Sequence, residues 1–348
     1  VTPGLVRYNV LIKKQDPETV VLYIPEDSQG TIIPATKIMT SQRRQAVNTV
    51  TDVTDTASTS GYETAIATWK AEMGSHAGWD DHEVWKKYTP YVLLGGHDLR
   101  YDTDSTTNTQ GFNSELGFVK RSYHDDYIDT YMPFLEYGNG NYTERYQGAR
   151  GDGNQQYIGA GFLVRRDRTD GLHYEAVLRA GQLNTDYHAD IAGHHISYDT
   201  DTNYIAAQLG LGKLYTHKDN DYDIYTKLFW SHIFSDDVDI YSDLGKAQYD
   251  SADSVRSRIG FRWTKHYQEN QTYYAGLGWD HEFDGTARAS YNNFDLPESN
   301  GKGDAGFLEL GWSSKSHADN PWNADVKLRG WVGMKKGIDY TITIGRAF

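Results

Sequence analysis

The closing segment of the chain, residues 337–348, alternates between apolar and polar or small residues and ends on an aromatic side chain. Side chains on a β-strand project to opposite faces with period two, so this segment predicts a strand with one apolar face. The residues on that face are Tyr340, Ile342, Ile344 and Phe348, with Arg346 as the one interruption. Such a strand is typical of a barrel wall that meets lipid outside and water inside.

The same alternation recurs in earlier segments, where it separates charged, polar or small residues from apolar ones. In residues 322–329, Trp, Ala, Val and Leu alternate with Asn, Asp, Lys and Arg, and residues 204–212 and 255–263 follow the same rule. In a closed barrel these charges would face a wet lumen. The charged residues that we expect to line it are Glu115, Glu175, Arg256, Arg258, Arg262, Asp280, Glu309, Asp325, Lys327 and Arg329.

Short polar turns divide residues 82–348 at nearly even spacing. Their centres lie near residues 125, 170, 219, 269 and 319, and a repeat of about 45 to 50 residues suggests one hairpin per interval. Longer polar stretches alternate with them, and we expect loops at 137–155, 184–203, 235–254 and 284–302. Short turns at one rim and long loops at the other are typical of outer-membrane barrels. We therefore predict an all-β fold, a 12-stranded antiparallel transmembrane β-barrel over residues 82–348.

The first 81 residues follow a different pattern. Residues 1–35 contain short apolar runs separated by turn residues, which indicates a small β-structure of its own. Residues 36–81 are polar and rich in Thr, with a helix expected at about 61–73. Ser60 and Glu63 have the spacing of a capping box, and Gly74 stands where a helix commonly ends.

Composition narrows the class of protein. No run of eighteen apolar residues occurs, so no transmembrane helix can be drawn, and a net charge of -14 disfavours nucleic acid as a partner. A barrel remains compatible, because only every second residue of a strand meets lipid. The chain has no cysteine, which suits an oxidising periplasm.

Aromatic residues make up 14% of the chain, which is more than a globular core of this size needs. Tyr and Trp favour strands in general, but barrels also concentrate them where lipid meets water. We expect such a girdle to include Trp230, Trp263, Trp279, Trp312, Trp322 and Trp331.

This arrangement resembles the translocator, or β-domain, of monomeric autotransporters (type V secretion). The resemblance rests on the β-structured start, the polar linker with a helix, Glu83-Val-Trp85 before the first strand, twelve strands, and the hairpin at 330–337 followed by Phe348. It implies a bacterial outer-membrane protein that is monomeric and displays its own passenger at the cell surface. Residues 1–35 would be the end of that passenger. Outer-membrane lipid, periplasmic chaperones and the barrel assembly machinery would be its partners, and the assembly machinery would read the terminal strand. Arg346 departs from the usual apolar pattern of that strand.

In that family the linker runs through the lumen. A helix extended into the preceding polar segment would cross a core of about 30 Å, and its polar sides would suit a charged lumen. The linker residues that we expect to pair with the lumen charges are Arg43, Arg44, Glu63, Lys70 and Glu72. The alternative is a flexible tether outside the barrel.

Three functions remain open at this stage. The leading hypothesis is a translocator that exports a passenger, with no catalytic, cofactor or metal site. The second is a porin or channel built on the same barrel, and the third is an outer-membrane hydrolase. The residues that the third hypothesis would use are Asp186, His188, Asp190, His194 and His195, which are expected in a loop at irregular spacing.

Overall fold

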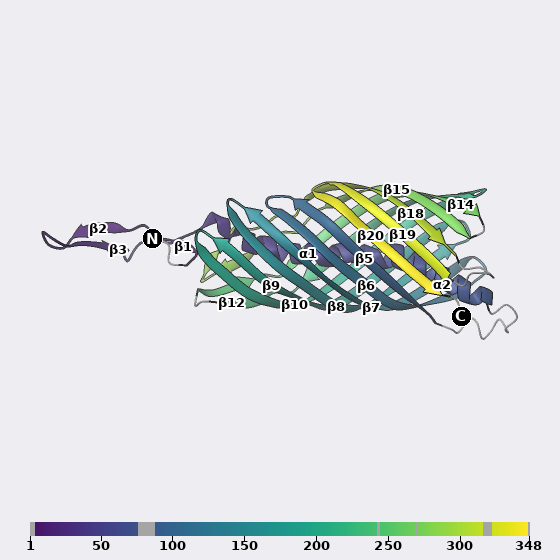
Figure 1. Ribbon diagram of the computed structural model, residues 1–348, viewed down its shortest axis with the longest axis horizontal. Coiled ribbons are helices and arrows are strands. Elements are labelled where there is room, and N and C mark those ends of the chain that lie inside the picture. Colours follow the sequence, from purple (N-terminus) through teal and green to yellow (C-terminus); the bar gives the residue numbers. More distant parts are fainter. Residues whose placement is uncertain (1–3, 76–87, 242–243, 269, 316–321, 347–348) are drawn as a thin grey trace.

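The computed structural model describes residues 4–75, 88–241, 244–268, 270–315 and 322–346. Twelve antiparallel strands close into a barrel, with a helix along its axis and the two chain ends at opposite rims (Figure 1). The predicted fold class is confirmed. The barrel strands are β5 (Thr89–Asp102), β6 (Thr106–Tyr123), β7 (Tyr127–Tyr146), β8 (Ala149–Arg168), β9 (Leu172–Ile191), β10 (His194–His217), β11 (Asn220–Ile233), β14 (Ala252–Gln268), β15 (Gln271–Glu282), β18 (Gly303–Ser314), β19 (Trp322–Gly333) and β20 (Lys335–Arg346).

The first and last barrel strands close the cylinder. β20 pairs antiparallel with β5 from Lys335↔Tyr101 to Ile342↔Leu94, and the yellow and blue strands lie side by side in Figure 1. The rim where β20 ends, which also carries the turns between β6 and β7, β8 and β9, and β10 and β11, is called the turn rim below. The opposite rim, from which the N-terminal segment emerges, is called the cap rim.

Two of the four predicted loops are wrong, because residues 137–155 and 184–203 are strands. β7 and β8 meet at a two-residue turn, Gln147 and Gly148, and β9 and β10 meet at Ala192 and Gly193. All four turn residues have positive φ, as tight hairpin turns require. The side chains on both faces are polar there, but the backbone pairs on regardless, so polarity alone was misread as a loop.

The other two stretches form a second, smaller sheet over the cap rim. Its strands are β12 (Asp236–Ile240), β13 (Gly245–Tyr249), β16 (Ala289–Tyr291) and β17 (Phe294–Asp295), paired in that order. We call this four-stranded unit the cap sheet. One apolar cluster joins the cap sheet to the cap-rim ends of β9 and β10 and to the N-terminal segment. That cluster includes Leu5, Val6, Ile33, Ile38, Met39, Tyr187, Tyr198, Val238, Ile240, Tyr249 and Tyr291.

The N-terminal segment forms two small hairpins. β1 (Val6–Arg7) pairs with β4 (Thr31–Ile32) against the cap sheet, while β2 (Leu11–Lys14) pairs with β3 (Val20–Tyr23). The second hairpin projects away from the barrel (Figure 1).

The lumen helix is three times as long as the sequence suggested. After a short 3-10 turn (Pro34–Thr36), α1 (Lys37–Thr56), a π-helical turn η2 (Ala57–Gly61) and α2 (Tyr62–Ser75) follow without a break. The predicted start near residue 61 is therefore wrong, and Ser60 lies inside the helix rather than capping it. Thr and Val form helices weakly in isolation, but here the barrel wall supplies the partners that propensity does not count. No helix among the described residues is long and apolar enough to cross a bilayer.

Glycines let large inward rings lie flat against neighbouring strands. On β18, a Cβ added at Gly311 would collide with the ring of Tyr274, which lies directly opposite on β15. At Gly330 on β19, an added Cβ would meet nothing within 4 Å. Overpacking of a close-packed site costs about 1 to 3 kcal/mol, so the two positions should respond differently to the same methyl group.

Gly311→Ala should therefore lower the temperature at which the barrel loses its heat-modifiable migration in detergent gels, while Gly330→Ala should leave it unchanged. If both variants lost heat-modifiable migration at the same temperature, this account of the Tyr274 contact would be contradicted.

Candidate functional site

The helix in the lumen buries both polar and apolar side chains against the wall. In α1, the polar side chains from Thr40 to Gln45 are at most 1% exposed, so the wall surrounds this part of the helix completely. Its apolar residues Ala46, Val47 and Val50 pack on an apolar part of the wall that includes Tyr204. The polar residues depend on the charged and polar lining of the barrel, because buried polar groups need partners.

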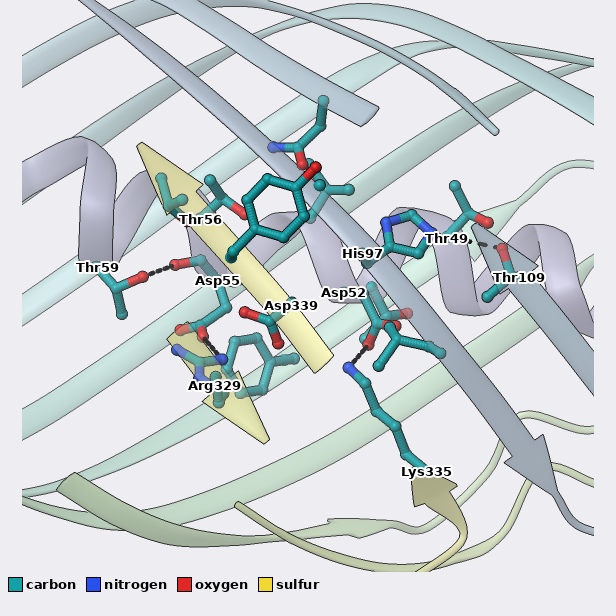
Figure 2. A pocket seen from close by; sticks show the side chains of 18 of the residues that line it. Thr49, Asp52, Asp55, Thr56, Thr59, His97, Thr109, Arg329, Lys335 and Asp339 are labelled. Carbon is teal, nitrogen blue, oxygen red and sulfur yellow. Dashed lines mark hydrogen bonds and ion pairs between the residues drawn. The ribbon is translucent and has the colours of Figure 1, made fainter. Parts of the chain in front are cut away.

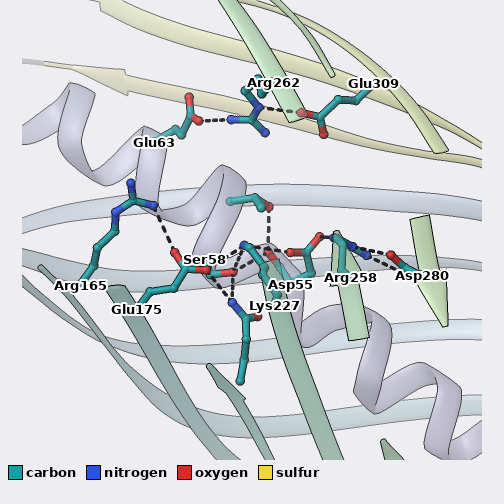
Figure 3. Close-up of polar contacts among 12 residues, drawn as sticks. Asp55, Ser58, Glu63, Arg165, Glu175, Lys227, Arg258, Arg262, Asp280 and Glu309 are labelled. Atoms are coloured by element: carbon teal, nitrogen blue, oxygen red, sulfur yellow. Dashed lines mark hydrogen bonds and ion pairs between the residues drawn. The ribbon is translucent and has the colours of Figure 1, made fainter. Parts of the chain in front are cut away.

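Three arginines on β14 connect the helix to the wall. Each guanidinium lies between one carboxylate of the helix and one carboxylate of β15 or β18, as Figure 3 shows for Arg258 and Arg262. Arg256 contacts Asp52 at 2.7 Å and Glu282 at 3.1 Å. We call Arg256, Arg258 and Arg262 the arginine stripe.

The other two members repeat the arrangement. Arg258 pairs with Asp55 of the helix and contacts Asp280 on β15 at 2.6 Å. Arg262 pairs with Glu63 of the helix and contacts Glu309 on β18 at 2.6 Å. Since an arginine fork can bond two carboxylates at once, each bridge fixes the helix to the wall in both rotation and height.

Asp55 is the most heavily bridged residue of the helix. Besides Arg258, its carboxylate contacts Arg329 at 3.0 Å and Lys227 at 3.3 Å, and all four side chains are at most 6% exposed. One turn earlier, Asp52 contacts Lys335 at 2.9 Å (Figure 2) and also accepts a hydrogen bond from the Tyr101 hydroxyl. Breaking a buried pair leaves an uncompensated charge, which makes these contacts strong constraints on the helix.

The π-helical turn keeps the helix acids in line with the arginine stripe. Asp55 and Glu63 are eight residues apart, and at 100° per residue an α-helix would place them roughly 80° out of line. The turn at Ala57–Gly61 takes up one extra residue, which removes about 100° of rotation and brings both acids to the β14 side. The π-helical turn therefore sets the rotation of Glu63 relative to Asp55.

Two further strands hold the helix through its backbone and hydroxyl groups. Arg179 on β9 donates to the Val50 carbonyl at 2.8 Å and to Thr54 at 2.5 Å, while its other side contacts Glu136 at 2.8 Å. Lys227 on β11, next to β14, donates to Ser58 at 2.9 Å in the π-helical turn. The helix is thus bound by several strands of the wall and not by β14 alone.

At the cap rim, Arg43 and Arg44 tie the start of the helix to the loops. Arg44 contacts Asp104 at 3.1 Å, and Arg43 donates to the carbonyls of Phe234 and, at 3.2 Å, Asp250. These partners are not the lumen residues that the sequence led us to expect.

Burial raises the pKa of the Asp236 carboxyl in the cap sheet above its ordinary value, although the Asp201 amide and the Arg43 charge oppose the rise.

Free space in the lumen is unevenly distributed. Beside α1, the cavities measure only about 60 Å³, around Asp52 and Lys335, and about 20 Å³, around Thr49 (Figure 2). Beside α2, toward the turn rim, a cavity of about 380 Å³ lies between Tyr62, Lys70 and the wall. The helix therefore fills the cap half of the barrel closely and the turn half loosely.

The structure places all ten residues of the expected lumen lining on the inner face, around the helix. Of the linker residues, Glu63 meets the arginine stripe, whereas Lys70 is exposed and borders the large cavity. The side chain of Glu72 lies outside the described part of the chain. Asp52 and Asp55 were missed, although two acids three residues apart in a polar segment indicate one charged helix face.

Trp230, Trp263, Trp279 and Trp322 lie on the outer face, each between 38% and 50% exposed, and Trp312 lies there half-buried. The prediction that Trp331 belongs to the girdle is wrong, because its side chain points inward and its indole donates to Asp339 at 2.5 Å. Alternation within β19 decides this, since Trp331 follows the inward Arg329 by two residues. On β20, Tyr340, Ile342 and Ile344 point outward, and Phe348 lies outside the described residues.

The candidate hydrolase residues lie on strands rather than in the expected loop. Asp186, His188 and Asp190 project outward from β9, and His194 and His195 lie at the start of β10. Their contacts are local ones, with His188 bonded to Ser197 at 2.9 Å and His195 to Asp190 at 3.1 Å. No group of three His, Cys, Asp or Glu side chains suited to a metal ion occurs among the residues described.

Comparison with known proteins adds the family context. The family model described as autotransporter beta-domain matches residues 134–320. The β-domain of the Bordetella autotransporter BrkA has a TM-score of 0.61 and 16% identity, covering 74% of this chain and 98% of that one. The translocator domain of autotransporter NalP from Neisseria meningitidis has a TM-score of 0.59 and 12% identity, covering 90% and 100%.

A third solved structure, the transport unit of the autotransporter AIDA-I from Escherichia coli, has a TM-score of 0.53 at 13% identity and covers 82% of this chain and 98% of that one. A search of curated proteins gave no match. At these identities the structures show a shared fold.

Proposed function

The chain belongs to the autotransporter β-domain family, and we propose that residues 37–75 belong to the linker between the exported passenger and the barrel, and are held in the pore as a plug. The protein is an outer-membrane translocator that exports a linked passenger. The observation that carries the proposal is the continuous helix that starts at the cap sheet, runs through the lumen and ends at Ser75, where α2 contacts β5, the first barrel strand. In this orientation the cap rim faces outside and the turn rim faces the periplasm.

We propose the following division of the chain. Residues 1–35 are the end of the passenger, residues 36–81 are the linker with its pore helix, and residues 82–348 are the barrel. The buried contacts of β1 and β4 with the cap sheet support the first boundary, because they hold the emerging segment against the outer mouth. The ion pairs of Asp52, Asp55 and Glu63 support the second, because they hold the linker inside.

We also propose that the end of β20 is the site read by the barrel assembly machinery. β20 pairs with β5 only as far as Ile342, so in the described residues its last stretch has β19 on one side alone. Pro90 lies on β5 near this point and has no amide hydrogen to donate. A half-paired strand end with outward Tyr340 and Ile344 offers a partner both backbone groups and apolar side chains. Before insertion, periplasmic chaperones would bind the same alternating apolar side chains. A closed barrel leaves no sheet edge for a second chain to pair with, which suits a monomer.

The role proposed here is transport and anchoring, with no catalytic step. The polar residues considered for hydrolysis are spread along the outer face of β9 and β10, and the lumen charges are engaged in holding the helix. The close fit of α1 also favours a plugged translocator over an open porin.

An epitope tag placed before Val1 tests the proposed orientation. In intact cells the tag should be bound by added antibody as fully as in permeabilised cells, because the cap rim faces outward. The same tag inserted between Asp125 and Asp126, in the turn between β6 and β7, should be bound only after permeabilisation. A tag between Gln147 and Gly148 serves as the matched surface control. Detection of the Asp125 tag on intact cells would reverse the proposed orientation.

A further inference from the structure

A five-residue pattern, Trp-x-His-x-Phe, occurs twice on the outer face of the barrel at the cap rim. The first copy runs from Trp230 to Phe234 at the end of β11, and the second from Trp279 to Phe283 at the end of β15. The two Trp and two Phe side chains are 39% to 52% exposed. We call each copy an aromatic ladder. A girdle needs only the Trp, so the repeated His and Phe call for another explanation.

The imidazole has the same surroundings in both ladders. The ring of His232 lies 6.1 Å from Trp230 in a stacked arrangement and 4.8 Å from Phe234 edge to face. The ring of His281 lies 5.7 Å from Trp279, also stacked, and 4.4 Å from Phe283. Two sites on different strands therefore present nearly identical three-ring surfaces.

Each imidazole is also fixed by an aspartate directly across the sheet. Asp253 on β14 lies opposite His232, and Asp304 on β18 lies opposite His281. The Nδ1 atoms are 3.0 Å and 2.7 Å from the carboxylates. Because an ionised carboxylate can only accept, Nδ1 must carry the hydrogen, and in the neutral ring Nε2 is then an acceptor.

In the first ladder the remaining polar atoms are therefore acceptors, because the Trp230 indole also donates to Asp253, at 3.0 Å. The second ladder additionally presents the indole N–H of Trp279, a donor that a hydroxyl oxygen can accept. A carboxylate 39% exposed in one ladder and 58% in the other repels a phosphate group. A ligand that donates hydroxyl hydrogens and offers apolar C–H faces to the rings matches the surface instead.

We propose that each of the two ladders binds the sugar headgroup of a glycolipid in the outer leaflet. The location supports this ligand, since the ladders lie on the lipid-facing side of an outer-membrane barrel, at the rim from which the passenger emerges. β14 separates β11 from β15, and the register places His232 opposite Asp253 and His281 opposite Ser257 of β14. The two imidazoles are therefore two strand spacings apart across the sheet, roughly 10 Å, and four residues apart along it, roughly 13 Å. At this separation each ladder binds its own headgroup.

The test uses the intact chain in a detergent without sugar, with bound lipid counted by native mass spectrometry. The probes are bis-phosphorylated lipid A, the same lipid A without its phosphates, and phosphatidylglycerol. Both forms of lipid A should bind, and phosphatidylglycerol should bind about tenfold more weakly, because it lacks the hydroxyl-rich rings whose hydrogen bonds favour the site.

The double variant His232→Phe and His281→Phe keeps the ring surfaces and removes the polar contacts. It should lose about tenfold in affinity for both forms of lipid A and nothing for phosphatidylglycerol. The matched control is His188→Phe with His195→Phe. This pair also lies on the outer face toward the cap rim, and its His195 also contacts an aspartate, Asp190, but it has no Trp or Phe ladder. Heat-modifiable migration confirms that each variant is folded.

Unchanged binding of lipid A by the ladder variant would overturn the proposal, and so would an equal loss in the control variant. Binding that disappears with the phosphates, or on addition of a chelator, would show recognition through phosphate or a bridging cation and would also overturn it. Retention of lipid A without phosphates, with loss only in the ladder variant, would support it.

Discussion

Removing residues 1–75 is expected to raise the conductance of the barrel in a planar bilayer by about tenfold or more, because a helix with its side chains fills a cylinder roughly 10 Å across. Around α1 the wall leaves only cavities of about 60 Å³ and 20 Å³, which do not provide a continuous path for hydrated ions. The cavity of about 380 Å³ beside α2 lies only in the turn half. The cap half is therefore where the intact chain blocks ions.

A shorter deletion provides the matched control. Removing residues 1–33 takes away both N-terminal hairpins but leaves α1, η2 and α2 in place, so conductance should stay close to that of the intact chain. Heat-modifiable migration in detergent gels would establish that both truncated chains are folded. If the loss of residues 1–75 left conductance unchanged, the helix would not be the plug. A rise with the shorter deletion alone would assign the block to the passenger segment.

Asp55→Asn is expected to have the largest effect of any single substitution in the helix. The change keeps the shape of the side chain but removes the charge shared by Arg258, Arg329 and Lys227. Each cation keeps one wall carboxylate, Asp280, Glu309 or Glu175, but loses its partner on the helix. Breaking buried ion pairs in this way costs up to about 3 to 5 kcal/mol. The barrel should convert to its unfolded gel form at lower temperature, and single channels should show brief openings that the parent lacks.

Asp27→Asn supplies the control, since it makes the same chemical change at an exposed position in the N-terminal segment. Surface substitutions of this kind usually alter stability by less than about 0.5 kcal/mol. Melting of the Asp55 variant at the parent temperature would show that the lumen ion pairs do not hold the helix. Lower melting without channel openings would mean that they stabilise the barrel but do not close it.

Residue type misled the sequence interpretation where register did not. Trp331 was assigned to the girdle because it is a tryptophan, yet its position two residues after Arg329 already indicated the lumen. The polar stretches at 137–155 and 184–203 were assigned to loops because of their composition, although strand pairing continues through them. The alternation of side chains was the more reliable signal in both cases.

The sequence by itself determined the barrel: its class, its twelve strands and which residues face the lumen. Because lipid lies outside the barrel and water inside, side chains alternate with period two along every strand. This alternation can be recognised within each segment of the sequence by itself. Only the tertiary structure decided the extent of the lumen helix, the partners of Asp52 and Asp55, and the cap sheet. A helix with many buried polar residues and weak propensity is stable only inside a wall that supplies their partners. Wall residues such as Arg179, Arg329 and Lys335 lie 129 to 283 positions along the chain from the helix residues that they contact.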